Sequence, residues 1–73
     1  MRIRINDASA ADDLIDYLES RAETIVERID DRELEVALLG SYNADAMQME
    51  LYLRIRAWES GRRAAGVQVE ITR

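Results

Sequence analysis

The chain has no cysteine, histidine, proline, lysine or phenylalanine. Without cysteine and histidine, it can form neither disulfides nor the usual zinc, copper and iron sites. The same absences, together with that of lysine, leave no Cys or Lys nucleophile and no near-neutral general base, and the four serines have no visible activating partner. The absence of proline also argues against a disordered linker. The sequence therefore predicts a protein that is not an enzyme and that uses no metal or cofactor.

The chain also lacks any apolar run close to the roughly 20 residues that span a membrane. Met1 is followed by the charged stretch RIRIN, which is unlike the apolar core of a signal peptide. The net charge of −5 gives no general attraction to nucleic-acid phosphates or to an anionic membrane. All ten basic residues are arginine, which indicates a GC-rich coding sequence. We expect a cytoplasmic protein with no nucleic-acid partner and no membrane partner.

What remains is a small folded chain. Its 73 residues suffice for one domain, so we expect residues 1–73 to form a single domain. A core of this size gives only about 3–5 kcal/mol of net stability. Because disulfides and the usual metals are excluded, oligomerisation is the remaining way for so small a chain to gain stability, although good packing alone can suffice.

Alternation of apolar and polar residues predicts strands in four segments. These are residues 1–6, 24–29, 33–39 and 67–71. The segment 24–29 is the least regular because Ile25 and Val26 are adjacent. It is typical of an edge strand, but it could instead extend the preceding helix, which would leave a three-stranded sheet.

Two helices separate these strands. The first follows a cap at Asp7 or Ser9 and carries apolar residues on one side and acids on the other. The second covers residues 43–61, with Asn43 as its N-cap and with Tyr42 and Met47 spaced as a hydrophobic staple. Glu50 and Arg54 are spaced to pair along this second helix.

The order β-α-β-β-α-β predicts an α+β fold, a ferredoxin-like two-layer sandwich. In this fold a four-stranded antiparallel sheet carries two helices on one face, and the first and third strands are central. Charges support the order, because Arg2 and Arg4 of the first strand would face acids on both neighbouring strands. Those neighbours offer Glu33 and Glu35 on one side and Gln68 and Glu70 on the other.

The long helix has apolar residues on two opposite sides, whereas a surface helix needs only one such side. One stripe consists of Ala44, Met47, Leu51, Ile55 and Trp58, and we assign it to the core. The other consists of Ala46, Met49, Leu53 and Ala57. We interpret this second stripe as a protein interface, against the alternatives of isolated exposed apolar residues or a helix rotated toward the core.

Other candidate sites have simpler explanations. The open face of the predicted sheet carries Arg and Glu without aromatic residues, which argues against RNA bases stacking there. Acids on the first helix and at Asp30-Asp31 match no calcium-loop motif and indicate a solvated surface. Trp58 could stack on a ligand, but its position on the Leu51–Ile55 stripe favours the core.

Three stretches resemble short ferredoxin-like proteins of GC-rich bacteria: ADDLIDYLESR, LEVALLGSY and MELYLRIRAWESGRRAAGVQVEITR. The resemblance spans most of the chain and implies the same fold, but no known activity. The β-α-β-β-α-β order of elements along the chain is also similar to that of ACT-type regulatory domains, which bind amino acids at the loop between the first strand and the first helix. Here that loop reads Asn6-Asp7-Ala8-Ser9, without the glycine usual in those domains.

Three functional hypotheses follow. The first is a small interaction module that forms a homodimer through Ala46, Met49, Leu53 and Ala57, with one different protein partner as the competing occupant. The alternative is a regulatory domain that binds an amino-acid-like ligand at residues 6–9. The third, a carboxylate-dependent enzyme, predicts stability that depends on Mg²⁺ or Ca²⁺.

Overall fold

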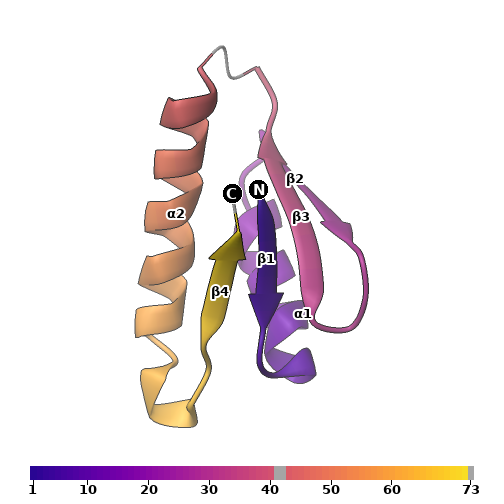
Figure 1. The fold of residues 1–73 in the computed structure, drawn as a ribbon, viewed down its shortest axis with the longest axis vertical. Helices are drawn as coiled ribbons and strands as arrows, with labels where there is room; N and C mark the ends of the chain where they lie inside the picture. The colour runs from indigo at the N-terminus through magenta and orange to yellow at the C-terminus, as the bar shows by residue number, and fades with distance from the viewer. Residues whose placement is uncertain (41–42, 73) are drawn as a thin grey trace.

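A computed structural model of the chain describes residues 1–40 and 43–72 (Figure 1). The strands and helices follow one another in the predicted order β-α-β-β-α-β. The elements are β1 (Arg2–Ile5), α1 (Ala8–Glu19), β2 (Thr24–Arg28), β3 (Glu33–Leu38), α2 (Ala44–Ser60), the 3₁₀ turn η1 (Arg63–Ala65) and β4 (Val69–Thr72).

The four strands form one antiparallel sheet in the order β2-β3-β1-β4. The predicted ferredoxin-like α+β sandwich is confirmed, with β1 and β3 in the centre. Ile3 of β1 lies opposite Leu34 of β3 and Ile71 of β4, so apolar residues of neighbouring strands share one face. The strand interpretation of segment 24–29 is confirmed too, because β2 pairs with β3 along all five of its residues. The alternative, a longer first helix and a three-stranded sheet, is wrong.

The core lies between this sheet face and the two helices. Ile3 and Ile5 are fully buried, whereas Arg2 and Arg4, which alternate with them along β1, point to the open face. α1 and α2 contact each other as well as the sheet, which closes the second layer. The buried apolar residues are Ile3, Ile5, Ala10, Ala11, Leu14, Leu18, Leu34, Val36, Leu51, Ile55, Trp58, Val67 and Val69.

Both helices begin at side-chain caps. Asp7, one of the two expected residues, caps α1 by accepting a hydrogen bond from the backbone N–H of Ser9 at 2.9 Å. Asn43 caps α2 as predicted, accepting from the N–H groups of Asp45 and Ala46. The expected staple between Tyr42 and Met47 involves a residue outside the described part of the chain.

The last strand begins two residues later than its alternation indicates, at Val69 instead of Val67. Gly66 lies in the left-handed region with φ 77°, which turns the chain after η1. At Gln68 the backbone ladder is only half formed: its carbonyl accepts from the Asn6 N–H at 3.2 Å, whereas its own N–H donates to the side-chain oxygen of Asn6 at 2.9 Å. Val67 is nevertheless buried, so its apolar character reflects the core and not strand pairing.

Candidate functional site: the outer face of α2

α2 has a core face and an opposite apolar face. Leu51 and Ile55 are fully buried, Trp58 is 3% exposed and the half-buried Met47 packs against them, so these four residues face the core as predicted; Ala44, the fifth residue assigned to the core stripe, is exposed. Met49 and Leu53 lie about 200° around the helix from Leu51 and are 57% and 59% exposed. Ala46 and Ala57, the two small members of the second stripe, are exposed as well. The structure therefore brings all four predicted interface residues onto one solvent-facing stripe, and the alternative of a helix rotated toward the core does not hold.

One flank of this stripe is held by ion pairs within the molecule. Arg54 contacts the carboxylate of Glu50, as predicted, and also that of Glu23 at 3.2 Å. It donates a further hydrogen bond to the hydroxyl of Thr24 at 3.0 Å. The polar side chains of this flank are thus occupied inside the molecule, while the apolar stripe beside them is open.

The other flank contains an aromatic residue that is not among the predicted interface residues. Tyr52 lies three residues after Met49, next to the stripe, and its side chain is 38% exposed. The guanidinium of Arg56 covers the Tyr52 ring at 5.2 Å from its centroid. The signal available in the sequence was a tyrosine three residues after Met49 on the predicted helix, since tyrosine is enriched at protein interfaces. We therefore add Tyr52 to the candidate site.

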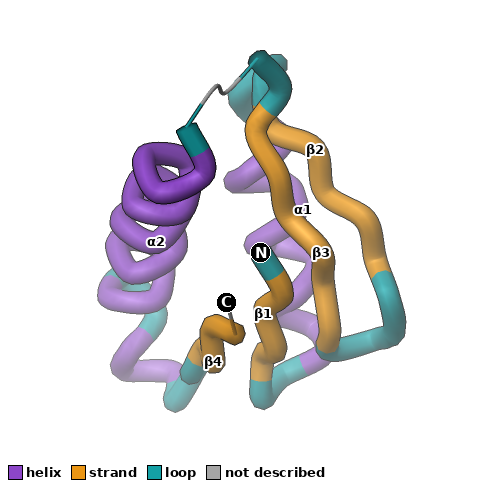
Figure 2. The backbone as a smooth tube through the Cα atoms, turned by 45° about the horizontal axis from the view of Figure 1, so that its top comes forward, coloured by secondary structure: helices purple, strands orange, loops and turns teal. Residues whose placement is uncertain are grey.

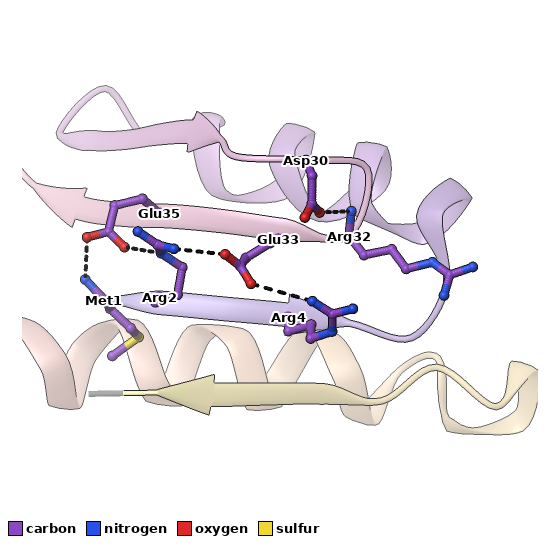
Figure 3. A network of polar contacts seen from close by, with 7 residues as sticks. All are labelled: Met1, Arg2, Arg4, Asp30, Arg32, Glu33 and Glu35. Atoms are coloured by element: carbon purple, nitrogen blue, oxygen red, sulfur yellow. Dashed lines mark hydrogen bonds and ion pairs between the residues drawn. The ribbon is translucent and has the colours of Figure 1, made fainter.

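The open face of the sheet is a second candidate surface, and charge pairs cover its central part over β1 and β3 (Figure 3). Arg2 binds Glu33 at 2.8 Å and Glu35 at 3.2 Å, and Arg4 lies 3.5 Å from Glu33. This agrees with the predicted pairing of β1 with β3. In the pairing of β1 with β4, Arg4 lies directly opposite Glu70, but the ion pair that Arg4 forms is with Glu33 of β3. The four strands carry no aromatic residue on which a base could stack.

A hollow of about 560 Å³ lies at the end of β1 and β4. Its lining combines three arginines and two amides with the carboxylate of Glu70. The guanidinium of Arg32 makes no hydrogen bond or ion pair with the described residues, and Figure 3 shows it beyond the end of β1. The full lining is Arg4, Ile5, Asn6, Arg32, Arg56, Gln68, Val69, Glu70 and Ile71.

The loop at residues 6–9 contributes little to this hollow, because its polar atoms are engaged elsewhere. The amide of Asn6 donates to the Gly66 carbonyl at 2.9 Å and accepts from the Gln68 N–H. The hydroxyl of Ser9 donates to the carboxylate of Asp7 at 2.7 Å. This hydrogen bond, together with that from the Ser9 N–H, lowers the pKa of Asp7 below its usual value. Within the loop, only Asn6 lines the hollow.

Acidic residues do not gather into a metal site in the part of the chain that the structure describes. On α1, Asp12 instead pairs with Arg28 of β2 at 2.9 Å. Neither helix is long and apolar enough to cross a membrane over the described ranges. Comparison with known protein families, with curated proteins and with solved structures returned no significant match.

Proposed function

We propose that this chain is a small interaction module that forms a homodimer through the outer face of α2, with Ala46, Met49, Leu53 and Ala57 at the interface. One observation carries the proposal: Met49 and Leu53 stand one helical turn apart, more than half exposed, directly opposite the core stripe. Complete burial of both side chains contributes roughly 1.5–3 kcal/mol each before the entropy of association is subtracted. That contribution is large beside the stability of so small a fold.

The spacing of the stripe suits a twofold axis. If two copies of α2 cross antiparallel with Leu53 near the axis, Met49 of one copy faces Ala57 of the other. A large side chain then meets a small one on both sides of the axis, which is the self-complementarity that a symmetric interface requires. Tyr52 borders the same stripe and adds an aromatic contact.

The test is the mass in solution by light scattering, over a range of concentrations, for the wild type and for Leu53→Glu. The wild type is expected to be a dimer and Leu53→Glu a folded monomer, because a buried unpaired carboxylate opposes association. Leu39→Glu is the matched control, since Leu39 is 61% exposed at the end of β3, away from the stripe. A wild-type monomer at millimolar concentration, or a dimer in Leu53→Glu, contradicts the proposal.

The hollow supports a second candidate function, the binding of an amino-acid-like ligand. The guanidinium of Arg32, which has no hydrogen bond or ion pair within the described residues, suits a carboxylate, and the carboxylate of Glu70 suits an ammonium group. The ligand would lie against β1 and β4, not against the loop at residues 6–9. A thermal-shift screen of free amino acids tests this function. A stabilising amino acid is expected to lose its effect in Arg32→Ala, and an unchanged melting temperature for all of them contradicts it.

A further inference from the structure

The two edge strands of the sheet differ in whether side chains bind their outward-facing backbone groups. β4 forms one edge, and α2 occupies the outward backbone groups of its first residue. The N–H of Val69 donates to the carboxylate of Glu59 at 2.6 Å, and its carbonyl accepts from Arg56 at 2.8 Å. A strand approaching this edge would have to displace both side chains. β4 is thus protected at Val69 in the way that sheet edges commonly are, whereas Ile71, its other outward-facing residue, has no such side-chain partner among the described residues.

β2 forms the other edge, and it is the outermost strand in Figure 2. The Leu39 N–H donates to the Glu23 carbonyl and the Ile29 N–H donates to the Glu33 carbonyl. Odd-numbered residues of this segment therefore direct their backbone groups toward β3. In an antiparallel ladder the residues between them direct theirs away. The N–H and C=O groups of Val26 and Arg28 accordingly face outward, without a hydrogen bond to the described residues.

The side chains around this edge are strongly acidic. Residues 7–31, which include α1 and β2, hold nine of the fifteen acids and two of the ten arginines, for a net charge of −7. The rest of the chain has a net charge of +2. α1 packs beside β2, where Arg28 binds Asp12 at 2.9 Å. The remaining acids of α1 are exposed and have no ion pair within the described residues; they are Asp13, Asp16 and Glu19.

Apolar contacts are available at the same edge. Ile25 and Ile29 are both more than 40% exposed on the open face of the sheet, and the carboxylate of Glu27 stands between them. Because successive side chains of a strand point to opposite faces, one face of an added strand would lie beside Ile25, Glu27 and Ile29, and its other face would lie on the side of the acidic helix α1.

We propose that the β2 edge binds an extended basic segment of a partner protein as an additional strand. Backbone hydrogen bonds to Val26 and Arg28 would provide affinity, and alternating arginine or lysine and apolar side chains would provide specificity. The charge selects this occupant over a second copy of the chain. A second copy paired on the same edge would bring together two acidic segments, each with a net charge of −7 over residues 7–31, and their repulsion opposes association.

The experiment uses an end-capped nine-residue peptide of alternating arginine and valine, labelled with fluorescein and measured by fluorescence anisotropy. A peptide with glutamate in place of arginine is the charge control. A peptide N-methylated at alternate amides keeps its charge but loses backbone donors. The arginine peptide is expected to bind at least about tenfold more tightly than either control. NMR chemical shifts are expected to change at the Val26 and Arg28 amides.

On the protein side, Val26→Pro removes one outward N–H without removing a hydrogen bond to β3. It is expected to weaken peptide binding about tenfold or more. Val26→Ala, which loses side-chain atoms but keeps the N–H, is the matched control and is expected to bind nearly as the wild type. Circular dichroism checks that both variants fold, and the N-methylated peptide tests the same backbone bonds on the wild-type protein.

Three results would overturn the proposal. The first is equal binding of the arginine peptide and its N-methylated form, which indicates diffuse electrostatic attraction. The second is a set of shifts at α2 or β4 instead of β2. The third is self-association that Val26→Pro abolishes, which identifies a second copy as the occupant. Leu53→Glu is expected to bind the peptide as the wild type does, so this proposal and the α2 interface can fail independently.

Discussion

Arg54 makes three polar contacts, two of which join α2 to the start of β2. Its side chain is only 11% exposed, and it binds Glu50, Glu23 and the hydroxyl of the buried Thr24. The contact with Glu50 could be predicted, because residues four apart on a helix are neighbours. The contacts with Glu23 and Thr24 could not, since they cross about thirty residues and depend on how α2 lies against the sheet. Long-range pairs of this kind carry no periodic signal in the sequence.

Substitution Arg54→Ala is expected to lower the free energy of unfolding by about 1–3 kcal/mol, because Thr24 loses its hydrogen-bond partner in a buried position. Arg4→Ala is the control, since Arg4 is exposed and lies 3.5 Å from its single acidic partner. Its loss is expected to stay below about 1 kcal/mol. Urea unfolding of both variants gives the comparison, and equal losses would contradict the structural role of Arg54.

At the scale of the element, the ends of helices and strands show what patterns can and cannot predict. Apolar periodicity located both helices and all four strands, and the cap residue Asn43 could be identified by type. The start of β4 could not, because Val67 continues the alternation although side chains of other segments bind the backbone at residues 68 and 69. The exposed stripe on α2 was visible from spacing alone. The hollow was not, because its arginines come from three separate elements.

The cap of α1 makes stability depend on pH. The hydrogen bond from the Ser9 side chain, and to a smaller extent that from the Ser9 backbone N–H, lowers the pKa of Asp7. The Asp7 carboxylate therefore binds a proton less readily in the folded state than in the unfolded chain. The contribution is therefore complete above the usual aspartate pKa of about 3.9 and is lost as the pH falls through the lower folded value.

Asp7→Asn keeps a capping oxygen but cannot ionise in this range. The difference in unfolding free energy between wild type and Asp7→Asn is expected to be constant from about pH 5 to 7 and to shift against the wild type below about pH 4. Urea unfolding at a series of pH values measures it. A difference that does not change with pH would show that Asp7 does not supply this dependence.

For the whole molecule, a small core and an exposed apolar stripe together predict a link between folding and assembly. If the native state dimerises and the unfolded state does not, the melting temperature rises with protein concentration. We expect an increase of a few degrees for the wild type over a hundredfold range of concentration, and none for Leu53→Glu. Differential scanning calorimetry measures this. A wild-type melting temperature that is independent of concentration would contradict the link.

Trp58 makes it possible to observe folding separately from assembly by optical means. It is the single tryptophan of the chain and is 3% exposed in the core, with the Arg62 guanidinium 4.6 Å from its ring centroid. Its indole is on the side of α2 opposite Met49 and Leu53. The emission wavelength is therefore expected to report the hydration of the core and to stay constant when the outer face changes its neighbours. The chain thus carries a built-in fluorescent reporter that distinguishes loss of the fold from loss of the partner.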